Sequence, residues 1–377
     1  MADLFLLCEY PTLNGAERSM LAVLDEVRTG GFQPAVIAPE QGPLAETLQA
    51  RDIEVIPFCW RNAGGTRPTQ DRLRRQLAEL LRRRRPDLLD ANSLATGRLS
   101  GPVARELGLA SIAHLREIIK LSRQAISDLN CHTRLLAVSR ATREFHVAGG
   151  LAGRKTHVLY NGVDLQKFRP RPPTGYLHRE LGLAADAPLV GAIGQISLRK
   201  AQDVFVRAAA LLAGRLPRVH FVVVGRRFSQ KDESRRFETD LLAAATGDLA
   251  GRLHLLGNRN DVERLLCELT LLAHPARQEP LGRVLLEAAA CGVPVAASAV
   301  GGTPEIFPAS SRCARLFPAD DPHALAAAII ELLTDGSLRA RIGTAARRRA
   351  EKAFDVHQAA ARLIEHYREV LSKSPAT

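Results

Sequence analysis

The stretch HPARQEPLGRVLLEAAACGVPVAASA, from His274 to Ala299, begins as a loop bracketed by prolines and ends in apolar residues. Its middle part, Leu281 to Cys291, is rich in Leu, Ala and Glu, which favour helix formation. Gly292 follows where helices commonly end in a left-handed glycine. The pattern therefore predicts a loop, a helix over Leu281–Cys291 and a buried strand over Pro294–Ala297, an order typical of α/β folds.

Two acids, Glu279 in the loop and Glu287 in the predicted helix, flank Gly282 at the helix N-terminus. The unpaired N–H groups of a helix N-terminus attract anions, and glycine lets a phosphate approach closely. Glu287 lies among apolar residues, where an acid needs hydrogen-bonding partners such as sugar hydroxyls. A phosphate site between two such acids indicates a nucleotide-sugar. The alternative interpretation is that both glutamates are solvated.

The longer stretch EPLGRVLLEAAACGVPVAASAVGGTPEI resembles the donor-site signature of retaining GT-B glycosyltransferases, specifically the group 4 family of the glycosyl transferases group 1 type. This resemblance implies a nucleotide-sugar donor and two facing Rossmann-like domains with a cleft between them. It implies that Glu287 holds the ribose and Glu279 the sugar hydroxyls. It also implies that Gly282, Arg283 and Lys200 bind the diphosphate.

The chain of 377 residues is long enough for two domains, and its 46% apolar content is typical of soluble globular proteins. It contains no apolar run long enough to span a membrane. Residues Met1 to Tyr10 resemble a first strand more than a signal peptide, because they lack a basic n-region and a cleavage site. The six cysteines are scattered, which favours free thiols in a reducing compartment. We therefore expect a cytoplasmic protein.

Apolar runs alternate with helical patterns in both halves of the chain, which predicts α/β domains with parallel sheets. The Pro- and Gly-rich segment NGVDLQKFRPRPPTGY, residues 161–176, is interpreted as a linker between the halves. We expect an N-terminal acceptor-binding domain over residues 1–170 and a nucleotide-sugar-binding domain over residues 171–355. The helix of residues 356–377 has no strand after it and is expected to cross back to the first domain.

Two motifs of the first half are candidates for substrate binding. NGAERSM follows the first predicted strand, and Gly15 there would let the backbone approach a phosphate or a sugar. A plain capping turn explains this motif equally well. The similar family carries Gly-Gly-Ala-Glu-Arg here, so Asn14 replaces one glycine. His114 ends the strand ASIAHL, where the family carries a histidine that contacts the donor sugar, which implies the same role for His114.

The loop GAIGQISLRKAQD, after the first strand of the second half, is the other informative stretch. The similar family supplies an Arg and a Lys to the diphosphate from this loop, followed by a Gly. Lys200 is retained, but Gln195 stands at the Arg position and Ala201 at the Gly position. Arg199 could replace the missing charge. A lysine ammonium suits a phosphate as a point charge.

Taken together, the predicted site has two parts. His114, Lys200 and Glu279 are the candidate catalytic residues. Gly225 and Gly257 end two further strands and would border the nucleotide base. The candidate donor-binding residues are Gly15, Gln195, Arg199, Lys200, Gly225, Gly257, Glu279, Leu281, Gly282, Arg283 and Glu287.

Metal ligands are not apparent in the sequence: it has no Asp-x-Asp motif and no paired His-Glu motif. Basic groups suffice in principle to stabilise a departing diphosphate, and members of the similar family are largely metal-independent. We expect no metal and no cofactor besides the nucleotide-sugar co-substrate.

One segment, with a net charge of 7 − 1 = +6, carries half of the net charge of +12. Residues Arg72 to Arg85, RLRRQLAELLRRRR, contain seven arginines and one glutamate, with leucines at helical spacing. This amphipathic pattern indicates either a solvated face or contact with an anionic membrane surface. Nucleic acid is not expected as a partner, because aromatics make up only 5% of the residues and no nucleic-acid-binding module is recognisable.

The sequence thus predicts a retaining, metal-independent glycosyltransferase of the hexosyltransferase type. It would use a UDP- or GDP-sugar and a glycan, lipid-linked or small-molecule acceptor, in cell-envelope or exopolysaccharide biosynthesis. It would be cytoplasmic or peripheral on the inner face of the membrane. Two alternatives remain open: a GT-B epimerase acting on UDP-N-acetylglucosamine, and a non-catalytic nucleotide-sugar-binding or scaffold protein, which the changes at Gln195 and Ala201 suggest.

Overall fold

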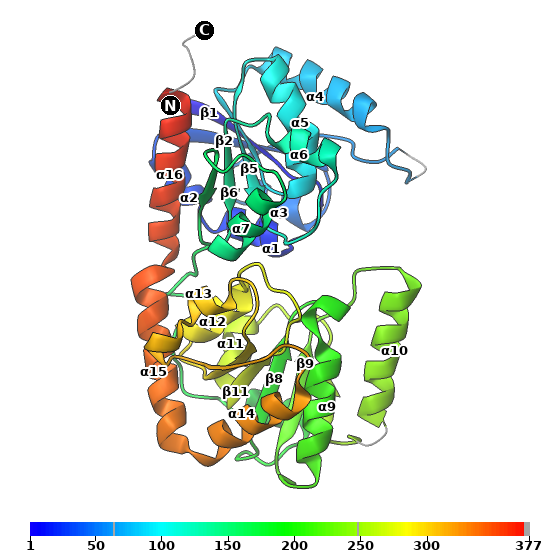
Figure 1. Cartoon of the computed structure of the whole chain (residues 1–377), viewed down its shortest axis with the longest axis vertical. Helices are drawn as coiled ribbons and strands as arrows, with labels where there is room; N and C mark the ends of the chain where they lie inside the picture. The colour runs from blue at the N-terminus through cyan, green and yellow to red at the C-terminus, as the bar shows by residue number, and fades with distance from the viewer. Residues whose placement is uncertain (63–64, 247–248, 373–377) are drawn as a thin grey trace. The chain divides into compact units, whose positions relative to one another are not determined.

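A computed structural model of the chain describes residues 1–62, 65–246 and 249–372 (Figure 1). The chain forms two compact units. The first contains residues 1–162 together with the C-terminal segment from Val356, and the second contains Val163–Asp355. The first unit therefore ends at Gly162, eight residues before the predicted boundary at 170. Each unit is an α/β domain with one parallel sheet, so the predicted fold class is confirmed.

The first unit contains a seven-stranded parallel sheet in the order β3-β2-β1-β4-β5-β6-β7. Its strands are short and apolar, and central ones such as β4 are buried along their whole length. The strands are β1 (Ala2–Leu7), β2 (Phe32–Ala38), β3 (Glu54–Pro57), β4 (Leu88–Ala91), β5 (Ala110–Leu115), β6 (Arg134–Ala137) and β7 (Thr156–Val158). The helices are α1 (Gly15–Leu21), α2 (Leu24–Thr29), α3 (Pro43–Gln49), α4 (Gln70–Arg84), α5 (Leu94–Glu106), α6 (Arg123–Leu129), α7 (Arg140–Ala148) and α16 (Val356–Ser372).

Alternate residues of the first sheet pack against different helices, as a strand period of two requires. Leu4 and Leu6 join a core with α1, α2 and α16, whereas Phe5 and Leu7 join a core with α4 and α5. Figure 1 shows α16, in red, running beside α2, and residues of these two helices are in contact.

The second unit contains a six-stranded parallel sheet in the order β10-β9-β8-β11-β12-β13. Helices α9, α10 and α14 contribute to one face and α11 and α12 to the other. The strands are β8 (Leu189–Ile193), β9 (His220–Val224), β10 (Leu253–Leu255), β11 (Leu271–His274), β12 (Val295–Ser298) and β13 (Arg315–Phe317). The helices are α8 (Tyr176–Leu181), α9 (Gln202–Ala213), α10 (Asp232–Thr246), α11 (Val262–Glu268), α12 (Arg283–Ala290), α13 (Thr303–Ile306), α14 (Pro322–Thr334) and α15 (Gly336–Ala353), with 3-10 turns η1 (Leu198–Lys200) and η2 (Ala309–Ser311).

The C-terminal helix α16 belongs to the first unit. Its buried residues include Tyr367, whose ring meets Phe32 of β2 edge-on at a centroid distance of 5.3 Å. The Tyr367 hydroxyl donates a hydrogen bond of 2.5 Å to Oδ2 of Asp90, in the middle of the buried strand β4. The helix is thus held by both apolar packing and a buried polar contact.

The basic helix α4 begins at Gln70, after the N-cap Thr69. The leucines at its predicted apolar positions are buried in the first-unit core: Leu73, Leu77, Leu80 and Leu81. Three of its arginines form ion pairs: Arg74 with Asp128 at 2.8 Å, Arg82 with Glu106 at 2.5 Å and Arg84 with Glu54 at 2.6 Å. The leucine face is therefore used by the core, and only the basic face of α4 is exposed. Across the described residues, all helices are too short or too polar to cross a membrane.

Candidate functional site

The N-terminus of α12 adjoins the loop that follows β11, as the sequence predicts. Gly282 caps the helix with φ of +102°, a backbone conformation that favours glycine. A Cβ atom on Gly282 would lie 2.7 Å from the Leu285 side chain and 3.3 Å from the Glu279 side chain. A larger residue at this position would therefore disturb both the start of the helix and the neighbouring acid.

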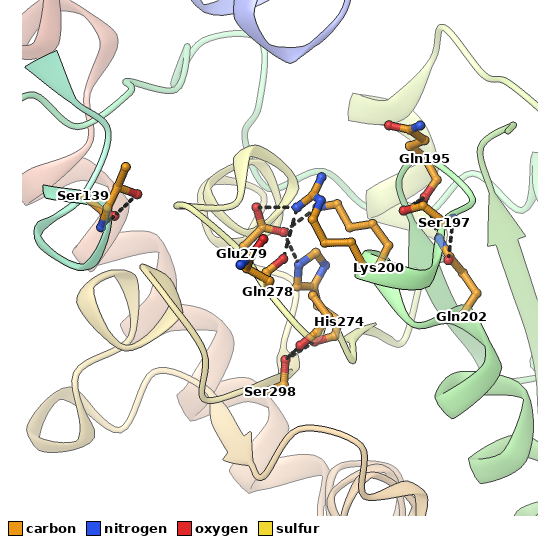
Figure 2. A network of polar contacts seen from close by, with 12 residues as sticks. Ser139, Gln195, Ser197, Lys200, Gln202, His274, Gln278, Glu279 and Ser298 are labelled. Carbon is orange, nitrogen blue, oxygen red and sulfur yellow. Dashed lines mark hydrogen bonds and ion pairs between the residues drawn. The ribbon is translucent and has the colours of Figure 1, made fainter. Parts of the chain in front are cut away.

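Glu279 is the centre of a buried polar cluster in this loop, shown in Figure 2. The residue is 5% exposed, and its Oε2 atom forms an ion pair with Lys200 and lies 2.7 Å from Nε2 of His274. The guanidinium of Arg199 lies 3.9 Å from Oε1. A carboxylate only accepts hydrogen bonds, so Nε2 of His274 is the donor. The cluster brings together residues from the β8 loop and from β11 with its following loop.

Electrostatics keep Glu279 ionised despite its burial. Burial by itself raises the pKa of Glu279, but Lys200, His274 and Arg199 outweigh it and hold the pKa below its usual range. Burial and the neighbouring Lys200 lower the pKa of His274, which is therefore neutral at pH 7. The cluster thus contains a carboxylate, an ammonium and a neutral imidazole, with Lys200 held in place before any ligand arrives.

Arg277 ties the two loops of the site together. Its Nη1 atom donates to the Leu198 carbonyl at 2.8 Å, and its guanidinium also binds the Asp203 carboxylate at 2.9 and 2.7 Å. The Arg277 backbone N–H donates to the Arg199 carbonyl at 2.9 Å, and Arg199 in turn donates to the Gln278 carbonyl at 3.1 Å. These contacts fix the backbone on both sides of Lys200.

Neither His274 nor Arg277 is among the predicted site residues. His274 ends β11, at the carboxyl edge of a parallel strand, where ligand-binding groups commonly lie. That position is the signal that could have identified His274. Arg277 carries no comparable signal, since its partner Asp203 is far away in the sequence.

Gln195 and Ala201 mark the two departures from the similar family. The Gln195 carbonyl accepts a hydrogen bond of 2.9 Å from Gln202, and in Figure 2 Gln195 has no dashed line to Glu279, Lys200 or His274. Ala201 is fully buried and adopts φ of +54°, in the left-handed region. The loop therefore keeps at Ala201 a conformation that glycine would adopt readily.

Glu287 lies on α12, one turn after Arg283. Its side chain is 13% exposed, and Oε1 lies 3.2 Å from the Arg283 guanidinium. Leu281, just before Gly282, is buried and can offer only its backbone to a ligand. The two predicted acids are thus held differently: Glu279 in a buried cluster, and Glu287 by a basic neighbour on its own helix.

The two predicted glycines, Gly225 and Gly257, and the neighbouring Gly194 follow three adjacent strands. Gly194, Gly225 and Gly257 follow β8, β9 and β10, and the Gly225 N–H donates to the Gly257 carbonyl at 2.7 Å. A Cβ atom on Gly225 would lie 1.9 Å from the Gly194 carbonyl oxygen. Only glycine fits at position 225, so this edge presents backbone with few side chains.

Two predicted site residues, Gly15 and His114, belong to the first unit, whereas the Glu279 cluster belongs to the second. Gly15 is exposed at the start of α1, where the Asn14 N–H donates to the Glu17 carboxylate at 3.1 Å in a capping contact. His114 is 5% exposed, and its Nε2 atom lies 3.2 Å from Oδ2 of Asp90. His114 thus faces the first-unit core beside Tyr367, and its contact with substrate stays a prediction.

The described part of the chain contains no group of three or more His, Cys, Asp or Glu residues arranged to hold a metal ion. Two side-chain cations, Lys200 and Arg199, lie near the Glu279 carboxylate. These residues fit a diphosphate held by basic groups.

Comparisons with known families assign both halves of the chain. The model of the family described as "Glycosyltransferase Family 4" matches residues 13–167, and that of "Glycosyl transferases group 1" matches residues 176–349. These matches cover the two units in turn.

Two characterised relatives are similar over most of the chain. One is the GDP-mannose-dependent monoacylated alpha-(1-6)-phosphatidylinositol monomannoside mannosyltransferase of Corynebacterium glutamicum, 30% identical over 296 residues, covering 73% of this chain and 74% of the relative. Another is the UDP-Gal:alpha-D-GlcNAc-diphosphoundecaprenol alpha-1,3-galactosyltransferase of Escherichia coli, 27% identical over 310 residues, covering 78% of each chain.

Among solved structures, HepE of Anabaena in complex with UDP has a TM-score of 0.84 and 25% identity. The comparison covers 98% of this chain and 100% of HepE.

Proposed function

The chain belongs to the family of GT-B glycosyltransferases of the group 1 and family 4 type, which act with nucleotide-sugars, and from this premise we propose that its second unit binds the donor at the Glu279–Lys200–His274 cluster. The observation that carries the proposal is the position of this cluster. A buried carboxylate and a preordered ammonium lie beside Gly282, at the N-terminus of α12. This arrangement offers hydrogen-bond acceptors to sugar hydroxyls and positive charge to a diphosphate.

Each donor group then has a partner. Glu279 accepts hydrogen bonds from the hydroxyls of the transferred sugar, and Glu287 accepts them from the ribose. The diphosphate lies between them, against the Gly282 turn, with Lys200, Arg199 and Arg283 as its positive neighbours. The open space beside Gly257, where an added Cβ would meet no atom within 4 Å, leaves room for the base at the sheet edge.

The transfer step needs stabilisation of the negative charge that develops on the departing diphosphate. Lys200 and the positive end of the α12 helix dipole provide it without reorganisation, because Glu279 already holds the ammonium in place. We propose that the acceptor attacks from the face of the leaving group, that the departing phosphate takes the acceptor proton, and that the sugar retains its configuration. The protein side chains bind and orient, and neither a metal ion nor a side-chain nucleophile is required.

The acceptor is proposed to be lipid-linked, in cell-envelope or exopolysaccharide assembly at the inner face of the membrane. The names of both relatives specify acceptors with lipid parts, a phosphatidylinositol mannoside and a diphosphoundecaprenol-linked sugar. The exposed basic face of α4 supports the same proposal, because it can approach anionic lipid headgroups. The first unit is then the acceptor-binding domain, with Gly15 and His114 as its candidate substrate contacts.

The experiment is a binding panel of UDP, GDP and ADP with their sugar conjugates, followed by mass spectrometry of a membrane extract incubated with the preferred donor. A ligand held at 100 times its Kd stabilises the protein by about 2.7 kcal/mol, so the preferred base gives a clear rise in Tm. A sugar added to an extractable lipid supports the proposal. Binding of a nucleotide-sugar without transfer to any acceptor would instead favour the non-catalytic alternative.

A further inference from the structure

The neutral ring of His274 has one N–H group, and it is committed to Glu279. Nε2 of His274 donates to Oε2 of Glu279 at 2.7 Å, so the ring proton lies on Nε2 and Nδ1 carries a lone pair (Figure 2). The side chains of His274 and Glu279 are 3% and 6% exposed. This hydrogen bond is therefore shielded from solvent.

The backbones of the two residues are held by other groups. His274 ends β11 and lies opposite Ala297 of β12. The Gly302 N–H donates to the Glu279 carbonyl at 2.9 Å, and the Ser298 hydroxyl donates to the Ala276 carbonyl at 2.5 Å. Since the backbone is fixed on both sides of the loop, the direction of the Glu279 carboxylate depends on its side-chain partners.

The two partners of Oε2 respond differently to a bound donor. Lys200 forms an ion pair with Oε2, and the proposed function places the same ammonium against the diphosphate. An ammonium has three N–H groups and can serve both, but its charge is then shared between Glu279 and a diphosphate. The single N–H of His274 is not shared in this way. The His274 hydrogen bond is thus the contact that keeps its full strength on Glu279 when the donor is present.

The other carboxylate oxygen, Oε1, is the one left for the sugar. In the part of the chain that the structure describes, Oε1 accepts no hydrogen bond, and the Arg199 guanidinium lies 3.9 Å from it, beyond hydrogen-bonding distance. A carboxylate fixed through Oε2 presents Oε1 in one direction. It can therefore recognise a hydroxyl group at one position of the transferred sugar.

Resting on the donor site proposed above, we propose that His274 is a positioning residue, whose Nε2–H group holds Oε2 of Glu279 while the diphosphate shares Lys200, and so keeps Oε1 directed at one sugar hydroxyl. Burial raises the pKa of Glu279, whereas Lys200 and the His274 hydrogen bond lower it. The same N–H therefore also helps to keep the carboxylate ionised. His274 then contributes to the binding of the sugar and not to that of the nucleoside diphosphate.

The test compares two conservative variants. His274→Gln places an amide N–H about as far along the side chain as Nε2 and can still donate to Glu279, whereas the shorter side chain of His274→Asn cannot reach. Isothermal titration measures the Kd of UDP-glucose and of UDP, or of GDP-mannose and GDP if guanine is the preferred base. The ratio of the two constants, nucleotide-sugar over nucleotide, should rise about tenfold or more in His274→Asn, the effect of a lost hydrogen bond to a charged group. It should stay within about twofold of wild type in His274→Gln.

The nucleotide alone provides the internal control. The Kd of UDP should stay within about twofold of wild type in both variants, which also shows that the second unit is folded. An equal rise of the ratio in His274→Gln and His274→Asn would overturn the proposal, because the shape of the ring and not its N–H would then be responsible.

Glu279→Ala distinguishes a failure of this inference from a failure of the donor site. Removing the carboxylate should raise the ratio at least as much as His274→Asn does. If Glu279→Ala raises the ratio and neither His274 variant does, the donor site stands and the role of His274 is wrong. If Glu279→Ala leaves the ratio unchanged, Glu279 does not bind the sugar, and both proposals fail.

A measurement on the wild type tests the inference even if His274→Asn does not fold. Ring nitrogen NMR spectra of the histidine-labelled protein show which nitrogen carries the proton. The His274 signal, identified by its absence from His274→Gln, should show the proton on Nε2 both in the free protein and with saturating UDP. A shift of the proton to Nδ1 on UDP binding would overturn the proposal, because Glu279 would then lose its donor when the diphosphate arrives.

Discussion

The Glu287 carboxylate offers the most direct test of the donor site at the residue scale. Its partner Arg283 lies on the same helix at 3.2 Å, so the acid is available to a ligand without breaking a tertiary contact. Glu287→Ala should weaken UDP binding by roughly 1.5–3 kcal/mol, the contribution expected of a hydrogen bond to a charged group. Isothermal titration of UDP measures the loss, and circular dichroism checks that the fold is retained.

Glu351→Ala is the matched control for this change. Glu351 forms an equivalent i,i+4 ion pair with Arg347 on α15, at 2.6 Å. Removing it tests the loss of one helix-surface carboxylate without touching the proposed site. Equal UDP affinity in wild type and Glu287→Ala would contradict the ribose assignment, as would an equal loss in both variants.

Lys200→Ala should reduce turnover more than it reduces folding. In the proposed mechanism the Lys200 ammonium faces the departing diphosphate, whose negative charge is largest in the transition state. Removing it also leaves Glu279 buried without its closest cation, so the pKa of Glu279 should rise. We expect kcat to fall by about 10²-fold or more, as for other lost transition-state donors. Steady-state kinetics and a urea unfolding curve separate the two effects, and kcat within twofold of wild type would move the anion site elsewhere.

His132 gives the first unit a specific pH dependence. The ring is fully buried, with Nδ1 3.0 Å from the Ser111 hydroxyl and Nε2 2.9 Å from the Gly97 carbonyl, and burial lowers its pKa to about 4. The unfolded chain, with a His pKa of about 6.5, binds the proton first. The stability that the neutral His132 ring contributes is therefore complete above about pH 6.5 and is lost as the pH falls towards 4. The largest loss is about 3 kcal/mol.

The measurement is the urea midpoint of first-unit unfolding between pH 4 and 7. His132→Gln keeps a donor and an acceptor without a titrating group, so its midpoint should depend less steeply on pH. The difference between the two slopes isolates His132 from other titrating groups, such as His366 in the same unit. Parallel slopes would contradict the prediction, because His132 would then bind its proton equally in the folded and the unfolded chain.

The predictability of the site differs from residue to residue. Local sequence patterns identify three site residues. Glu279 and Gly282 are an acid and a glycine before a predicted helix, and Lys200 is a lysine in a loop after a predicted strand. The ion pair between Lys200 and Glu279 joins positions 79 residues apart, so no local pattern specifies it. The same holds for Arg277 and Asp203. For His114 the sequence predicts the strand, but the contact with Asp90 exists only because β4 and β5 are neighbours in the sheet.

At the scale of elements, the stretch from Leu281 to Cys291 predicts a helix from its composition, and the structure has α12 there over Arg283–Ala290. Helix α8, by contrast, begins at Tyr176, the last residue of the segment interpreted as a linker. With six residues, α8 is too short to form by its own pattern and depends on packing, for example against α11.

Helix α4 carries the prediction about the membrane. Its leucines are buried, so only its charges can contact lipid. Each basic residue near an anionic leaflet contributes about 1 kcal/mol at most. Replacing Arg82–Arg85 by serine should therefore weaken binding to anionic liposomes at least tenfold at low salt, with little binding to neutral liposomes in any variant. Liposome sedimentation at low and high salt measures the affinities.

A variant with the same charge change in the second unit is the control for α4. Arg207, Arg215, Arg218 and Arg312 are exposed, and Arg312 shares the left-handed backbone of Arg85. If replacing these four by serine reduces liposome binding equally, the net charge of the protein explains the attachment. If liposome binding depends neither on lipid charge nor on the replacement of Arg82–Arg85 by serine, the basic face of α4 is only solvated. An acceptor without a lipid part is then favoured.

At the scale of the whole molecule, the chain leaves the first unit at Gly162, builds the second and returns at Val356. The alternation of strands and helices predicts two α/β domains. The predicted boundary at residue 170, however, lies eight residues after Gly162, where the first unit ends. The Pro-rich segment that suggested it, residues 161–176, belongs mostly to the second unit, where α8 follows it. A Pro- and Gly-rich composition indicates that a connection between domains is near, but it does not indicate the residue at which the chain passes from one core to the other.

Because the chain returns to the first unit in α16, we expect the stability of the first unit to depend on α16 and that of the second unit not to. The helix buries Val356, Ala360, Leu363, Ile364, Tyr367 and Val370 in the first unit. The five larger side chains, at about 1.5–3 kcal/mol each, amount to roughly 8–15 kcal/mol, comparable with the 5–15 kcal/mol that stabilises a domain. A chain ending at Asp355 should therefore lose hydrogen-exchange protection throughout β1–β7, while the second unit keeps its protection and its UDP affinity. Glu365→Ala, on the exposed side of α16, is the control and should leave both units unchanged. If the truncated first unit stays as protected as in the full chain, its core is complete without α16, and the buried Tyr367–Asp90 contact contributes little to folding.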